Sequence, residues 1–122
     1  MAKISVISVQ IPPNETSSST ADLGSHALVA IEMPEEFNGT TITFQSKAKW
    51  TEDVTAGPAF EDLDDVYDSG GNQITWTVAA GRVVVPTAAH AAAFAPLRYL
   101  RVVAGTGQGS ARELRLIVKE GN

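Results

Sequence analysis

The chain has 122 residues, of which 43% are apolar and 19% are charged, and it contains no cysteine. This composition indicates one folded domain and excludes an intrinsically disordered chain. The formal net charge of −5 disfavours nucleic acid as a partner. No apolar run approaches the ~18 residues that a membrane helix requires, so no membrane partner is expected.

Residues 3–10 form the first expected strand. Its aliphatic side chains alternate in two phases, with Ile4 and Val6 in the first and Ile7, Val9 and Ile11 in the second. This change of phase predicts a β-bulge or an edge strand that serves two neighbours. Residues 12–25 are rich in Pro, Ser and Thr and predict an exposed loop. Residues 1–20 therefore form either an extended N-terminal arm or an ordinary strand and loop.

The rest of the chain contains short β-prone segments separated by turn residues. One helical turn is expected at residues 87–95, with Thr87 as its N-cap and Pro96 ending it. The expected strands are residues 3–10, 26–34, 40–50, 62–68, 73–78, 82–86, 97–105 and 112–120. This pattern predicts an all-β fold, an antiparallel Greek-key or jelly-roll sandwich of about eight strands, as a single domain over residues 1–122.

Three glycine-containing segments connect these strands. Residues 69–72 and 79–81 are expected to be tight turns of two linked hairpins, because glycine tolerates the backbone angles of such turns. Residues 106–111, between the last two strands, are expected to be mobile. The expected core consists of Ile42, Phe44, Trp76, Val78, Val84, Phe94, Tyr99, Val102, Leu114, Leu116 and Val118.

The densest group of carboxylates lies in the stretch "FEDLDDVYD", residues 60–68. Its acids are Glu61, Asp62, Asp64, Asp65 and Asp68. An EF-hand loop needs oxygen ligands at its first, third and fifth positions and glycine at its sixth, and the spacing fails from either possible start. No neighbouring pattern predicts the raised carboxyl pKa that acid–base catalysis requires. We expect an exposed solubilising edge, with a weak surface cation as the alternative.

Other catalytic and ligand-binding patterns are also missing. His26 and His90 have neither zinc-ligand spacing nor a nucleophile motif beside them. The G-x-G-x-G pattern of residues 105–109 precedes a strand and not the helix that a phosphate site uses. We therefore expect no enzyme activity, with no catalytic residue, no cofactor and no metal ligand; a small hydrolase is the least favoured alternative.

The charge is divided unevenly along the chain. Twelve acids and three lysines precede residue 69, whereas six basic and two acidic residues follow residue 68. This asymmetry suits docking between proteins, or pairing of the two halves within one fold. The candidate interface residues are Ile4, Val6, Ile7, Val9, Ile11, Trp50, Arg98 and Arg101.

Several short motifs follow one another in a fixed order along the chain. They are Met33-Pro34, Thr43-Phe44-Gln45, Val66-Tyr67-Asp68 with Gly71-Asn72, Ala80-Gly81-Arg82, Tyr99-Leu100-Arg101 and Arg112 to Val118. Their order resembles a group of small virion structural proteins of tailed bacteriophages. The resemblance covers about residues 28–118, and the loop after Gln45 departs from the pattern of the group.

This resemblance implies a β-sandwich virion protein that decorates the capsid, as cement proteins do. The expected partners are the major capsid protein and further copies of the chain, as a homodimer or homotrimer. The expected location is the capsid surface of the virion, after synthesis in the host bacterial cytoplasm, because residues 1–10 do not form a signal peptide.

The alternative function is a carbohydrate- or receptor-binding β-sandwich module of a tail fibre or baseplate. Trp50, Tyr67 and Trp76 would then form a platform on which sugar rings stack. Against this, Trp76 alternates with Ile74 and Val78, which places it in the core.

Overall fold

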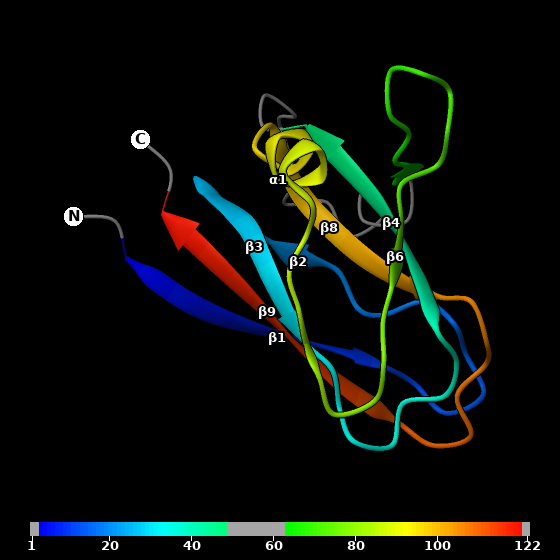
Figure 1. The fold of residues 1–122 in the computed structure, drawn as a ribbon. Helices are drawn as coiled ribbons and strands as arrows, with labels where there is room; N and C mark the ends of the chain where they lie inside the picture. The colour runs from blue at the N-terminus through cyan, green and yellow to red at the C-terminus, as the bar shows by residue number, and fades with distance from the viewer. Residues whose placement is uncertain (1–2, 49–62, 121–122) are drawn as a thin grey trace.

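The computed structural model describes residues 3–48 and 63–120. These residues form two antiparallel β-sheets that pack face to face, with one short helix at one end (Figure 1). The all-β sandwich predicted from the sequence is confirmed. Its elements are β1 (Ile4–Ile11), β2 (Ala21–Asp22), β3 (His26–Glu32), β4 (Thr41–Ala48), β5 (Asp64–Asp65), β6 (Thr75–Thr77), β7 (Val83–Val84), α1 (Ala88–Phe94), β8 (Leu97–Ala104) and β9 (Arg112–Glu120).

The strand order explains how the chain closes on itself. Sheet A has the order β1-β9-β3-β7, and sheet B has β2-β8-β4, with both β5 and β6 paired to β4. Strands from the two halves of the chain therefore pair in succession: β1 with β9, β2 with β8, β3 with β7, and β4 with β5 and β6. A long antiparallel ribbon rolled up in this way is a jelly roll.

The core lies between the two sheets and follows the alternation of the strands. Every residue of the expected core is buried except Val84, which is half-buried and packs against the core. Phe44, Trp76 and Phe94 form its aromatic centre, with ring centroids 4.8–5.5 Å apart in edge-to-face geometry. Tyr99 is buried too, but it alternates with the core residue Leu100 and so points away from the interior of the sandwich.

Helix α1 confirms the expected helical turn. The Thr87 side-chain oxygen accepts a hydrogen bond from the His90 backbone N–H at 3.3 Å, and Ala95 is the C-cap immediately before Pro96. The helix buries Phe94 completely against Phe44 and Trp76. The helix therefore closes one end of the sandwich (Figure 1).

Of the two linked hairpins predicted in the middle of the chain, the first is present in short form: Tyr67 pairs antiparallel with Gln73, and the Asp68 N–H donates to the Asn72 carbonyl at 2.8 Å. The second is wrong, because β6 and β7 belong to different sheets. Strands β5 and β6 do not pair with each other; they lie end to end along β4, with Asp65 opposite Gln45 and Thr75 opposite Thr43. Residues 67–73 protrude between them as a small loop, drawn green at the upper right of Figure 1. The turn at residues 79–82 then leads from sheet B to sheet A. Local turn signals predicted both turns, but long-range pairing with β4 and β3 decided the partners of the strands.

The exposed loop expected at residues 12–25 is correct only in part: residues 12–16 and 24–25 are exposed, but the middle of the segment is not a free loop. Residues 16–23 run along β8 as an edge segment, with β2 paired to Leu100 and Tyr99. Ser18 is buried there, and its hydroxyl oxygen accepts the Val102 N–H at 2.9 Å. The Ser18 and Ser19 hydroxyls and the backbone bonds to β8 stabilise this segment, in which apolar alternation is limited to Ala21 and Leu23.

Of the two alternatives expected for the first strand, the β-bulge is absent, whereas β1 does lie at an edge of its sheet. Strand β1 pairs with β9 in one register from Ile4 opposite Lys119 to Ile11 opposite Arg112. The described irregularity of sheet A lies in β3, between Leu28 and Ala30. The apparent change of phase in β1 has another cause: Ile4 and Val6 are aliphatic residues that face solvent.

The glycine-rich segment of residues 106–111, expected to be mobile, is anchored. The Gln108 side chain is buried, accepts the Asn38 N–H at 2.9 Å, and donates to the carbonyls of Asn38 and Thr106 at 2.8 Å. Its backbone carbonyl accepts the Asn14 N–H at 2.6 Å. One glutamine therefore joins three connecting segments at the end of the sandwich opposite α1 (Figure 1).

Candidate functional site

The strand at one edge of sheet A contains five of the expected interface residues. Ile7 is half-buried, whereas Val9 and Ile11 are buried in the core and are not available for an interface. Ile4 and Val6 point away from the core and remain 60% and 57% exposed. The strand therefore divides into an outward apolar face and an inward face that holds β1 on the sandwich.

The backbone of β1 has one satisfied side and one open side. The Glu120 N–H donates to the Lys3 carbonyl at 2.8 Å, which fixes the phase of the antiparallel ladder. Because hydrogen-bonded pairs alternate in such a ladder, Ser5, Ile7 and Val9 bond to β9. The N–H and C=O groups of Ile4, Val6 and Ser8 then point to the opposite side, where no strand of the described residues pairs with them.

The two candidate arginines are engaged within the chain. The Arg98 guanidinium donates from Nε and Nη2 to the two carboxylate oxygens of Asp22 at 3.1 and 3.3 Å. Arg101 donates from Nε to Gln45 Oε1 at 3.0 Å, and its Nη2 donates to the same oxygen. Both arginines stabilise the outer side of sheet B in this geometry. Trp50, the remaining candidate, lies outside the described residues.

The pKa values of Arg98 and of the neighbouring Tyr99 are both raised where Arg98 pairs with Asp22. The hydrogen bond to Asp22 raises the pKa of Arg98 above its ordinary value. Burial raises the pKa of the neighbouring Tyr99 hydroxyl, and the Asp22 carboxylate adds to that effect. Both groups therefore keep their protons at neutral pH, so neither provides a base for acid–base chemistry.

The acidic segment forms the edge of sheet B, as far as it is described. Asp64 pairs with Lys47 at 3.0 Å, and Asp65 accepts a hydrogen bond from the Gln45 amide at 2.9 Å. Asp68 holds the protruding loop together, since its Oδ1 accepts the backbone N–H groups of Gly70 and Asn72 at 2.9 and 3.0 Å. Glu61 and Asp62 lie outside the described residues. Within the described ranges, no three His, Asp or Glu side chains gather as a metal site would require.

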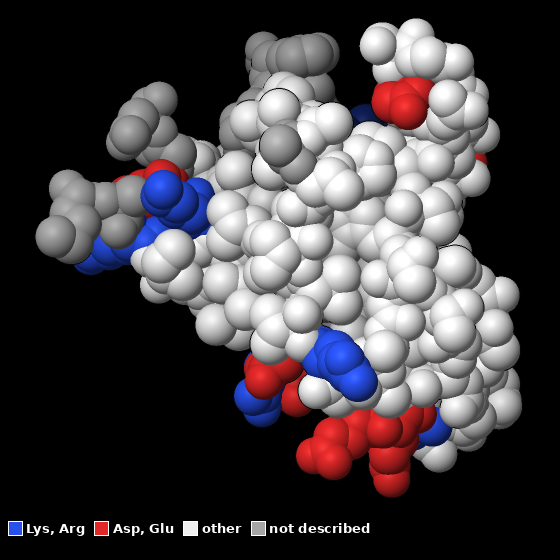
Figure 2. All heavy atoms as spheres, viewed as in Figure 1, with Lys and Arg blue, Asp and Glu red and all other residues white. Residues whose placement is uncertain are grey.

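The residues between sheet B and α1 form a face that sequence analysis did not identify as a site. From Ile74 to Leu97 the sequence contains a single Lys, Arg, Asp or Glu residue, Arg82. Val83 and Val85 are 57% and 70% exposed there. Figure 2 shows this face, with few charged atoms where the chain runs from β6 to α1 and with most charged residues gathered at the lower and left margins. We call residues 75–95 the uncharged face; the absence of charge in the sequence was the signal that could have revealed it.

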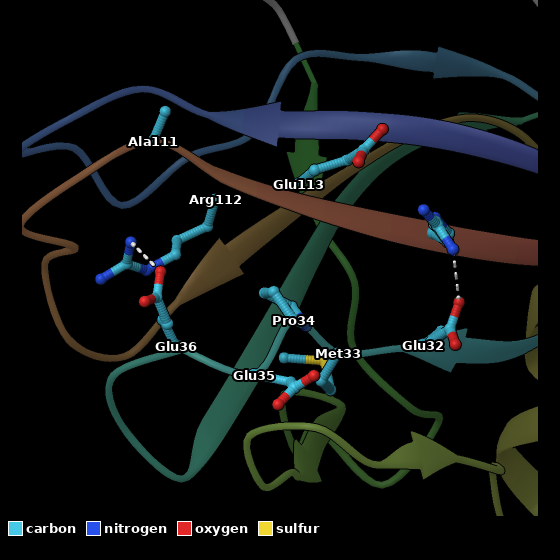
Figure 3. A pocket seen from close by; sticks show the side chains of 9 residues that line it. Glu32, Met33, Pro34, Glu35, Glu36, Ala111, Arg112 and Glu113 are labelled. Carbon is cyan, nitrogen blue, oxygen red and sulfur yellow. Dashed lines mark hydrogen bonds and ion pairs between the residues drawn. The ribbon is translucent and has the colours of Figure 1, made fainter.

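An open groove of about 700 Å³ lies between β9 and the segment that follows β3 (Figure 3). Arg115 pairs with Glu32 at 3.3 Å, and Arg112 approaches Glu36 at 3.8 Å. These pairs, like Arg98 with Asp22, join an arginine of the second half of the chain to an acid of the first half. The groove is therefore a place where the two halves neutralise each other, as one interpretation of the charge asymmetry predicted.

The remaining candidates do not form a common site. Trp76 is 3% exposed in the core, whereas Tyr67 is 56% exposed beside the protruding loop, so these two rings do not share a stacking platform. His90 lies in α1 and His26 begins β3. No helix of the described residues is long and apolar enough to span a membrane. No protein-family model, no curated protein and no solved structure matches this chain.

Proposed function

We propose that this protein is a non-enzymatic virion structural protein of a tailed bacteriophage, a head decoration protein that binds and stabilises the capsid surface. Three things support the proposal. The first is the resemblance of its motifs to small phage virion proteins. The second is the jelly-roll fold, which recurs in viral capsid domains and also in lectins. The third, and the one specific to this chain, is the uncharged face, with Val83 and Val85 exposed at its centre.

The uncharged face suits a flat protein surface better than a small molecule. It combines short strands, an alanine-rich helix and exposed valines, and its one charge is Arg82. Exposed aliphatic side chains that are not surrounded by charge mark protein–protein contacts. Repetition of one such contact over a symmetric shell adds avidity to a weak single interaction.

Binding to capsids tests the proposal. The purified protein is mixed with mature heads that lack it, and the pellet after sedimentation is analysed for bound protein. We expect binding in many copies per head. Val83→Lys with Val85→Lys should abolish binding while the circular dichroism spectrum is unchanged, because both side chains are exposed. Ser110→Lys, at an exposed position of the connection between β8 and β9 outside the uncharged face, is the matched control and should bind normally.

Two outcomes would overturn the proposal. Absence of binding to heads under all conditions removes the decoration function. Binding to tails in few copies, or to host polysaccharide, supports the alternative of a tail-fibre or baseplate module. The second outcome would also require an aromatic or polar binding site other than a platform that includes the buried Trp76.

A further inference from the structure

The free edges of the two sheets differ in how they are protected from pairing. Strand β2 and strand β7 have two residues each, and Pro86 follows β7 closely. Strand β5 presents Asp64 and Asp65, and a protruding loop separates it from β6. Short length, proline, charge and interruption are the devices by which proteins keep edge strands from pairing with other chains.

Strand β1 is neither short, charged nor interrupted, and its prolines, Pro12 and Pro13, follow only after Ile11, beyond the open segment Ile4–Ser8. It is eight residues long, keeps one register with β9, and exposes Ile4 and Val6. No charged residue occurs from Ile4 to Asn14. We propose that β1 pairs antiparallel with β1 of a second copy, which joins two copies of sheet A into one continuous sheet across a two-fold axis at Val6.

The backbone determines this register. On the open side, the N–H and C=O groups of Ile4, Val6 and Ser8 have no partner among residues 3–48 and 63–120. Gln10 is already occupied there: its N–H donates to Ser19 Oγ at 3.1 Å and its carbonyl accepts the Ser19 N–H at 2.9 Å. Antiparallel pairing that uses all three free residues places Val6 opposite Val6 of the second copy and Ile4 opposite Ser8 of the second copy. Shifting the register in either direction leaves at least one of these residues without a partner in the Ile4–Ser8 segment.

The side chains favour a second copy as the occupant. In this register the two Val6 side chains meet on the outer face of the sheet, with the two Ile4 side chains on either side of them. Lys3 falls opposite Val9 of the second copy, so no like charges oppose each other along the shared edge. A symmetric contact of this kind needs the same residues on both partners, and one uncharged strand supplies them.

The proposed dimer leaves the uncharged face free. Sheet A has the order β1-β9-β3-β7, so β1 and β7 lie at opposite edges. Dimerisation through β1 is therefore independent of capsid binding, and it is measured in solution without capsids.

Charge substitution at the axis tests the proposal. Val6→Lys and Val6→Glu each place two like charges opposite each other in a homodimer, whereas an equimolar mixture places a lysine opposite a glutamate. We expect sedimentation velocity from about 1 µM to about 1 mM to show a dimer for the unmodified chain. Each variant alone should dimerise at least about tenfold more weakly, and the mixture should recover the dimer. Thr77→Lys and Thr77→Glu, at an exposed position of sheet B, should change nothing.

Hydrogen exchange provides a second readout that does not depend on a substitution. With increasing concentration, the amides of Ile4, Val6 and Ser8 should become protected, whereas those of Ser5 and Ile7 are already protected by β9. A chain that stays monomeric up to about 1 mM overturns the proposal. So does a dimer that is unchanged in both Val6 variants, because its axis would then lie elsewhere.

Discussion

Two sheet edges can be compared: β1 in sheet A, and β5 with β6 in sheet B. Among the described residues, each edge has backbone groups without a strand partner on one side, and such groups can pair with another chain. On sheet B the edge is broken by the loop of residues 67–73 and bears Asp64 and Asp65 beside that loop. On sheet A the edge is continuous and uncharged, with aliphatic side chains in solvent. The contrast supports the proposal that the edge of sheet A pairs with a second copy, whereas the edge of sheet B is protected from pairing.

The two edges also differ in how they are attached to the core. Strand β6 packs Trp76 against both Phe44 and Phe94, whereas β1 contributes the smaller Val9 and Ile11. Trp76→Ala should lower the free energy of unfolding by about 3–5 kcal/mol, because it opens a cavity at the aromatic centre. Chemical denaturation measures the loss. Thr77→Ala, which changes an exposed neighbour, should stay within about 0.5 kcal/mol; equal effects of both would contradict the aromatic anchor.

Gln108 holds the Pro12–Glu15 turn that ends β1. Gln108→Ala should lower the free energy of unfolding by about 2–3 kcal/mol, because the N–H and C=O groups of Asn38 lose their buried partners. Hydrogen exchange at Asn38 should become faster at the same time, whereas the Asn14 N–H keeps its bond to the backbone carbonyl of residue 108. Gln73→Ala changes the same residue type at a half-buried position beside the protruding loop, and a similar loss there would mean that the effect is not specific to the buried site.

The alternation of the β1 backbone is tested by proline at adjacent positions. Ser5→Pro removes an N–H that bonds to β9 and should cost about 1–2 kcal/mol of unfolding free energy. Val6→Pro removes an N–H that points to the open side, so it should cost less than about 0.5 kcal/mol while it weakens self-association. Thermal denaturation and sedimentation are measured on both variants. The reverse order of the two stability losses would show that the assigned phase of the ladder is wrong.

The protection of the sheet B edge is tested by removing its charge. Asp64→Val with Asp65→Val should change the unfolding free energy by less than about 1 kcal/mol, since exposed ion pairs contribute little. Self-association through β5 should increase, which light scattering detects. Glu113→Val with Glu120→Val, at exposed positions of the interior strand β9, removes the same charge and should not produce it. Unchanged association in the β5 variant would mean that the loop alone protects this edge.

Part of the fold could be predicted because it depends on local signals. Alternation identified the core positions around Phe44, Trp76 and Leu116, and Thr87 with Pro96 marked the ends of the helix. The partners of the strands could not be predicted, because pairing of β5 and β6 with β4 depends on contacts far apart in sequence. The segment of residues 16–23 was missed for another reason: side chain-to-backbone hydrogen bonds, as at Ser18, stabilise it, and its apolar alternation is limited to Ala21 and Leu23.

For the candidate interface, too, local signals predicted one part and long-range contacts decided the rest. Five aliphatic residues of β1 were expected to take part, but only the pairing with β9 shows that Val9 and Ile11 belong to the core and that Ile4 and Val6 face solvent. A β-prone strand at residues 3–10 and a sandwich fold could be predicted from the sequence, because alternation and composition are local properties. The sequence left open whether this strand contains a bulge or lies at an edge. The tertiary structure of the described residues places it at an edge, because an edge is defined by which strands are absent beside it.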